Sequence, residues 1–165
     1  MALNKVLVSL AALAAFTLPA MAQISSEGGP IYINSERTES LERERKVLLI
    51  GNVDIQQGDA RLRADTVTMI FAERPAGATQ TTSVGGGFGQ VQTMIAEGNV
   101  FYITADMKAK GDRGVYDAAS DIITMTGNVA LLRERDVAEG AVLRVEIGNR
   151  RTTLDGGDGR TRMVI

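Results

Sequence analysis

The sequence predicts an all-β fold, and three observations support this prediction. Apolar and polar residues alternate with a period of two along several stretches, which is the pattern of half-buried antiparallel strands. Val, Ile and Thr, whose branched side chains fit a pleated sheet, are enriched in these stretches. One ambiguous segment aside, no stretch after residue 22 combines helical spacing with helix caps. Short strands in series are typical of a sandwich, a jelly roll or an open barrel.

The first 22 residues have the three parts of a secretory signal peptide. Lys5 gives a positive start, residues 6–18 are apolar, and Ala20-Met21-Ala22 is a site that signal peptidase reads. At about 1.5 Å per residue, the apolar stretch is too short to cross about 30 Å of hydrocarbon as a helix. We therefore expect cleavage after Ala22, export, and one mature domain made of residues 23–165.

Two segments break the regular strand pattern. Residues 35–46 carry acidic and basic side chains whose spacing fits either a short helix or a charged hairpin. Residues 76–90 are rich in Gly, Thr and Ser and end in a glycine run, which predicts a flexible loop. The glycine run lacks the final Gly of a dinucleotide-binding motif, so we do not expect it to bind phosphate.

The strands expected after residue 46 each have one apolar face. Val53 and Ile55 form one such face, and Leu62 belongs to a second. Val67, Met69 and Phe71 form a third face, and Leu143, Val145 and Ile147 form a fourth. Charged or hydroxyl side chains occupy the alternate positions, so each strand should have one buried side and one solvated side.

A Gly-Asn-Val tripeptide follows an apolar run three times, at residues 51–53, 98–100 and 127–129. Gly-Asn suits a two-residue hairpin turn because Gly takes a positive φ at no steric cost. It equally suits a bulge or corner at which a strand bends between sheets. Both interpretations give the dipeptide a structural role. The intervals between the repeats are too unequal for a regular solenoid.

The composition excludes several classes of function. The 165 residues contain 18 Lys and Arg, 20 Asp and Glu, and no His, Cys or Trp. Without His or Cys the chain cannot form a Ser-His-Asp triad, a thiol nucleophile, the usual zinc sites or a disulfide. A net charge of −2 lacks the basic footprint of a general nucleic-acid binder. We expect an aliphatic core without cofactor or metal.

Five segments, taken in order, resemble the OstA-like family of lipopolysaccharide-transport domains. They are Pro-Ile-Tyr-Ile-Asn-Ser at 30–35, Gly-Asn-Val-Asp-Ile-Gln-Gln-Gly at 51–58, Leu-Arg-Ala-Asp at 62–65, Gly-Asp-Arg-Gly-Val-Tyr-Asp at 111–117 and Ile-Ile-Thr-Met-Thr-Gly-Asn-Val at 122–129. The sequence departs from the family at residues 139–141, where a Gly-Asp pair is usual, and in the loop at 72–90. The resemblance implies a single twisted β-jelly roll, partly open along one side, whose apolar interior receives the acyl chains of lipid A.

The resemblance also implies which residues contact lipid. Ile31 and Ile33 match the family's first lipid-facing strand and are the strongest candidates. The others follow from alternation and are Val53, Ile55, Leu62, Met69, Phe71, Val100, Tyr102, Val129, Leu131, Leu143 and Val145. On the residues alone, the same alternation is typical of the packed core of a sandwich. Because a register slip of one residue reverses a strand's faces, alternation fixes which residues share a face better than which face looks inward.

Location and partners follow from the resemblance as well. It implies a periplasmic carrier of lipopolysaccharide between an inner-membrane export complex and an outer-membrane translocon. The implied partners are an LptC-like inner-membrane protein, an LptD-like outer-membrane protein and further copies of the chain joined end to end. The apolar C-terminal residues Met163, Val164 and Ile165 would form part of such a joint, because exposed strand edges pair with other chains.

Three other interpretations remain open from the sequence. The first is a secreted β-adaptor that docks partners through its edge strands without holding lipid. The second is a membrane-anchored, LptC-like component that keeps its N-terminal helix. The third is a secreted hydrolase using a carboxylate pair such as Asp106 and Asp112, although nothing in the spacing singles these two out.

Overall fold

The computed structural model describes residues 23–26, 29–73 and 89–165. The expected signal peptide and most of the loop at 72–90 lie outside these residues. In the described part the chain forms strands and a single 3-10 turn, which confirms the all-β prediction. None of the described residues forms a helix with the length and apolar character needed to cross a membrane.

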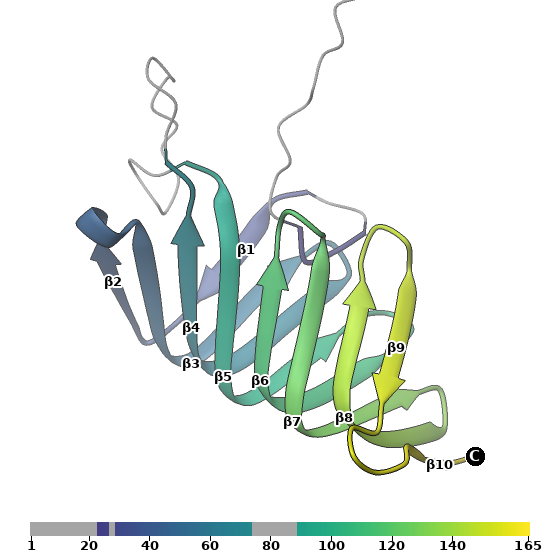
Figure 1. Cartoon of the computed structure of the whole chain (residues 1–165). Helices are drawn as coiled ribbons and strands as arrows, with labels where there is room; N and C mark the ends of the chain where they lie inside the picture. Colours follow the sequence, from purple (N-terminus) through teal and green to yellow (C-terminus); the bar gives the residue numbers. More distant parts are fainter. Residues whose placement is uncertain (1–22, 27–28, 74–88) are drawn as a thin grey trace, which may run out of the picture.

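The strands of the described chain form one antiparallel sheet (Figure 1). The strand order is β1-β3-β4-β5-β6-β7-β8-β10, with β2 pairing β3 and β9 pairing β8. The strands are β1 (Ile31–Asn34), β2 (Arg37–Leu41), β3 (Lys46–Gln57), β4 (Ala60–Phe71), β5 (Val91–Ile103), β6 (Lys108–Asp117), β7 (Ile122–Arg133), β8 (Asp136–Glu146), β9 (Arg151–Asp155) and β10 (Arg162–Val164). Each long strand therefore pairs with its neighbour in sequence.

Each long strand runs through two halves of this sheet, which face one another as two leaves (Figure 1). Residues 54–57 of β3 pair with β1, whereas residues 46–50 pair with β2. At the other end of the sheet, residues 137–139 of β8 pair with β10 and residues 142–146 with β9. The first leaf thus ends at β1 and β10, and the second leaf ends at β2 and β9.

The strands bend between the leaves at the three Gly-Asn pairs. The pairing register shifts at residues 50–53 of β3, 97–100 of β5 and 126–129 of β7. At each shift both the Gly and the Asn have a positive φ, between 43° and 81°. The corner interpretation is therefore right for these pairs, and the hairpin interpretation is wrong. A fourth Gly-Asn pair, at residues 148–149 and without a following Val, lies in the hairpin turn between β8 and β9.

A carboxylate from a neighbouring segment stabilises each corner. The side-chain amide of Asn99 donates to Asp65 at 2.9 Å, and that of Asn128 donates to Asp112 at 2.7 Å. Asn52 makes the same contact with Glu36. Asn tolerates the left-handed conformation, and here its side chain also anchors the bend.

Residues 35–46 form a hairpin and not a helix. Strand β2 pairs antiparallel with the start of β3, and a 3-10 turn at Glu42–Glu44 connects them. Arg45 closes the turn with a φ of 51°, and its backbone N–H donates to the carbonyl of Glu42 at 3.1 Å. Of the two structures that the charge pattern allowed, the hairpin is the correct one.

Candidate lipid-binding interior

The predicted lipid contacts all lie on the inner face of the leaves. Ten of them are buried in the core, namely Val53, Ile55, Leu62, Met69, Phe71, Val100, Tyr102, Val129, Leu143 and Val145. Ile31, Ile33 and Leu131 are partly buried and pack against that core. The eleven residues inferred from alternation therefore share the buried face of their strands, and the pair on β1, taken from the family resemblance, packs against the same core. Contact with lipid itself stays a prediction.

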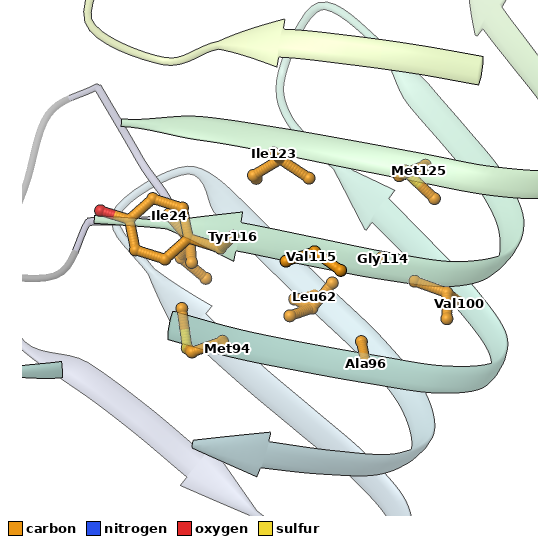
Figure 2. A pocket seen from close by; sticks show the side chains of 10 residues that line it. All are labelled: Ile24, Leu62, Met94, Ala96, Val100, Gly114, Val115, Tyr116, Ile123 and Met125. Carbon is orange, nitrogen blue, oxygen red and sulfur yellow. The ribbon is translucent and has the colours of Figure 1, made fainter. Parts of the chain in front are cut away.

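The side chains of the described residues pack closely in this interior, since the core residues are at most 8% exposed. A cavity of about 10 Å³ lies between Leu62, Met94, Tyr116 and Met125 (Figure 2). That volume is about enough for one water molecule, whereas a ligand pocket usually measures about 300–1,000 Å³. An acyl chain can therefore enter only if groups that now fill the interior move aside.

The mouth of the molecule is the side on which turns of the two leaves face each other. A second cavity, of about 90 Å³, opens there. Asp59 and Asp106 line it from turns of the first leaf, and Ile147 and Arg150 line it from a turn of the second leaf. This cavity has charges of both signs on its walls and connects the apolar interior with polar surroundings.

Residues 23–26, which we call the strap, lie across this mouth. Ile24 is completely buried and reaches into the interior beside Tyr116 (Figure 2). The hydroxyl of Ser25 donates to Asp59 at 2.7 Å on the first leaf. On the second leaf, the Tyr116 hydroxyl accepts a hydrogen bond from the backbone N–H of Gln23 at 3.0 Å. The strap therefore connects the two leaves.

Two side chains of the first leaf hold the backbone of the strap. The Gln57 side-chain oxygen accepts hydrogen bonds from the N–H of Ile24 at 2.6 Å and from the N–H of Ser25 at 3.3 Å. The Tyr102 hydroxyl donates to the carbonyl of Ile24 at 2.7 Å. Gln57 is itself buried, and its amide nitrogen donates to the carbonyl of Gly29 at 3.0 Å. We call Gln57 and Tyr102 the clamp.

The phenols at the mouth have raised pKa values. Burial raises the pKa of Tyr102 far above its ordinary value, and the negative charges of Asp59 and Asp121 raise it further. Burial also raises the pKa of Tyr116. Tyr102 therefore keeps its proton, and with it the ability to donate a hydrogen bond, to a higher pH than an exposed phenol.

Sequence reasoning missed both Gln57 and Ile24. A signal for Gln57 was present, since it continues the inward alternation of Val53 and Ile55 with a polar side chain. A polar residue at an inward position indicates a buried partner. The partner lies 33 residues earlier in the chain, in a segment without any strand pattern.

The carboxylates considered for hydrolysis have separate surroundings. Asp106 lines the cavity at the mouth. Asp112 anchors the β7 corner through Asn128. On the outer face, Arg61 binds Asp54, and this hydrogen bond lowers the pKa of the Asp54 carboxyl. These charged groups lie in three different places: Asp106 at the mouth, Asp112 at a corner, and Arg61 with Asp54 on the outer face.

Comparisons with known proteins agree with this architecture. The family model described as "LptA/(LptD N-terminal domain) LPS transport protein" matches residues 32–151. The lipopolysaccharide export system protein LptA of Escherichia coli K12 is 32% identical over an alignment of 136 residues, which covers 79% of this chain and 66% of that protein. The uncharacterized protein R00383 of Rhizobium meliloti is 28% identical over 95% of this chain and 82% of its own length.

A longer relative and a solved structure match as well. The LPS-assembly protein LptD of Yersinia enterocolitica is 26% identical over 78% of this chain, and the match spans 15% of LptD. The crystal structure of LptH from Pseudomonas aeruginosa, described as the LptA homologous periplasmic component of a lipopolysaccharide transport device, has a TM-score of 0.67 and 17% identity. That match covers 87% of this chain and 99% of LptH, so the fold is shared over nearly the whole domain.

Proposed function

This chain belongs to the LptA and LptD N-terminal domain family of lipopolysaccharide-transport proteins, and from that premise we propose that it carries lipopolysaccharide across the periplasm. It would receive the lipid from an LptC-like inner-membrane partner and pass it to an LptD-like outer-membrane partner. Removal of the signal peptide after Ala22 is part of this proposal. Mass spectrometry of the exported protein tests it, because an LptC-like anchored component would keep residues 1–22.

The observation that carries the proposal is the continuous apolar interior shared by the two leaves. Every long strand contributes inward aliphatic side chains, so the interior follows the whole length of the folded sheet. Burial of acyl chains there would contribute about 0.8 kcal/mol per CH₂ group. The interior also contains Met69, Met94, Met107 and Met125, whose flexible side chains can adapt to a heterogeneous lipid.

The ends of the leaves suit the proposed joining of copies. Strands β1 and β2 end the sheet on one side, and β9 and β10 end it on the other. Met163, Val164 and Ile165 are exposed at the second of these ends. Pairing of such edges would extend both leaves from one copy into the next and make the interior continuous. The same edges would receive the LptC-like and LptD-like partners.

The filled interior favours a second candidate, a β-adaptor that docks partners without holding lipid. Photo-crosslinking in cells separates the two candidates. A photoreactive residue at Ile33, on the inner face of β1, should form adducts with lipopolysaccharide. The same residue at Tyr32, whose side chain is 64% exposed, provides the matched control on the opposite face. Adducts with protein alone at both positions would favour the adaptor.

A further inference from the structure

The strap offers the clamp the same groups as an acyl chain that is joined to a sugar through an amide. Its branched apolar side chain, Ile24, points into the interior. The backbone N–H of Ile24 donates a hydrogen bond to the side-chain oxygen of Gln57, and the carbonyl of Ile24 accepts one from the hydroxyl of Tyr102. An acyl chain linked to a sugar through an amide offers the same three features, namely an N–H, a carbonyl and an apolar tail. An ester-linked chain offers the carbonyl and the tail.

Removal of the strap would have two consequences for the site. It would free the volume of Ile24 at the point where the interior meets the mouth. It would also leave the buried Gln57 oxygen and Tyr102 hydroxyl without their partners, which is unfavourable unless another group replaces them. An incoming molecule that supplies an apolar tail and an amide linkage satisfies both requirements, because its N–H can donate to Gln57 and its carbonyl can accept from Tyr102.

We propose that the strap is an internal pseudo-ligand. Once a lipid has displaced the strap, Tyr102 donates to the carbonyl of an acyl chain's amide or ester linkage, and Gln57 accepts from the N–H of an amide linkage. This inference rests on the proposed function and adds to it a specific subsite and an intramolecular competitor. The strap closes the mouth of the empty carrier and keeps its apolar interior from water. When the lipid binds, the carbonyl of its acyl linkage replaces the carbonyl of Ile24 as the acceptor for the Tyr102 hydroxyl.

A reversible lock on the strap tests the displacement. The native chain has no Cys, so the double variant Ser25→Cys, Asp59→Cys contains a single cysteine pair at side chains that touch at 2.7 Å. We expect the oxidised protein to bind purified lipid A at least about tenfold more weakly than the same protein after reduction. Binding can be measured by native mass spectrometry. The single variant Ser25→Cys, treated with the same oxidant, controls for effects of oxidation.

The outcomes separate the two proposals. Equal binding of lipid A in the oxidised and reduced states would overturn the displaced strap and leave the carrier function standing. No binding of lipid A by the wild-type protein or by the reduced variant would overturn the carrier function, and this inference with it.

The clamp is tested with two probes that share a dodecyl chain length and a glucose-type head. N-lauroyl-glucosamine carries an amide, and dodecyl glucoside has no carbonyl group. We expect wild-type protein to prefer the amide probe and the variant Tyr102→Phe to reduce that preference about fivefold, the effect of one hydrogen bond. Because the variant also loosens the strap, the ratio of the two affinities is the readout. An unchanged ratio would overturn the role of Tyr102.

Discussion

Gly127 shows how strongly a single corner residue is constrained. Its φ is +77°, and a Cβ built on it would lie 2.6 Å from Oδ2 of Asp112. Asp112 cannot move away freely because it accepts the hydrogen bond from Asn128. We therefore expect Gly127→Ala to lower the free energy of unfolding by about 1–3 kcal/mol, measured by urea denaturation.

Gly159 provides the matched control for this substitution. It lies in the exposed turn before β10, and a Cβ added to it would have its nearest neighbour 3.6 Å away. Gly159→Ala should change the free energy of unfolding by less than about 0.5 kcal/mol. Equal losses in the two variants would show that the corner geometry is not what constrains Gly127.

The buried Tyr102 phenol predicts a loss of stability in alkali. Its folded pKa is raised above the ordinary value of 10.0, mainly by burial. Above about pH 10 the unfolded chain releases this proton while the folded chain keeps it, so the free energy of unfolding falls as the pH rises. Below that pH the contribution is fully present. Denaturation curves at pH 9 and pH 11 should show a smaller decline in Tyr102→Phe than in wild type, and equal declines would refute the prediction.

At the scale of single residues, the sequence predicts which side chains are buried wherever the alternation of neighbouring residues along a strand determines burial. Alternation along β3 placed Val53 and Ile55 on the inner face correctly. The same alternation extends to Gln57 but does not reveal its role, because the group that makes its burial favourable is Ile24 in the strap. A period-two pattern contains no information about a distant segment that returns to the mouth.

At the scale of elements, β10 is the most exposed edge in the described chain. It pairs with β8 along Val137–Glu139 only, and Met163 on it is 63% exposed. If copies join through this edge, Met163→Lys should abolish self-association, because edge lysines oppose strand pairing. The free energy of unfolding should change by less than about 0.5 kcal/mol, since the side chain is largely outside the core. Light scattering and urea denaturation measure the two effects.

Thr161→Lys is the control for this edge. Thr161 is also exposed, and its replacement adds the same charge one position before β10 begins. Self-association should survive in this variant. If both lysine variants associate like wild type, β10 is not part of the joint.

The corners show which elements the sequence could predict only in part. Gly-Asn allowed both a hairpin and a corner, because either one accommodates positive φ. The corner forms because a carboxylate of a different segment binds the Asn, as Asp65 of β4 does at Asn99 of β5. These partners are up to 34 residues apart. The pairing of β10 with β8, and not with the preceding β9, likewise depends on long-range order.

At the scale of the whole molecule, the two leaves share a single core, so anything that enters the interior acts on the stability of the entire fold. The leaves share the long strands β3 to β8, and no boundary divides the buried cluster between them in the described chain. A guest that replaces the strap and binds only the folded state must raise the free energy of unfolding. A guest that binds exposed apolar segments of the unfolded chain must lower it.

Lipid A should therefore raise the thermal midpoint of the protein. At a free concentration of 100 times its Kd, a single bound lipid stabilises the fold by about 2.7 kcal/mol, which corresponds to an increase of roughly 5–10 °C for a domain of this size. Scanning calorimetry measures the shift. The variant Ile33→Asp, which places a charge on the inner face of β1, should show a smaller increase. A midpoint that stays constant at saturating lipid A would mean that the interior is a permanent core, and that the family fold serves here as an adaptor. A midpoint that falls would mean that lipid A binds the unfolded chain more strongly than the folded one, which also contradicts the carrier.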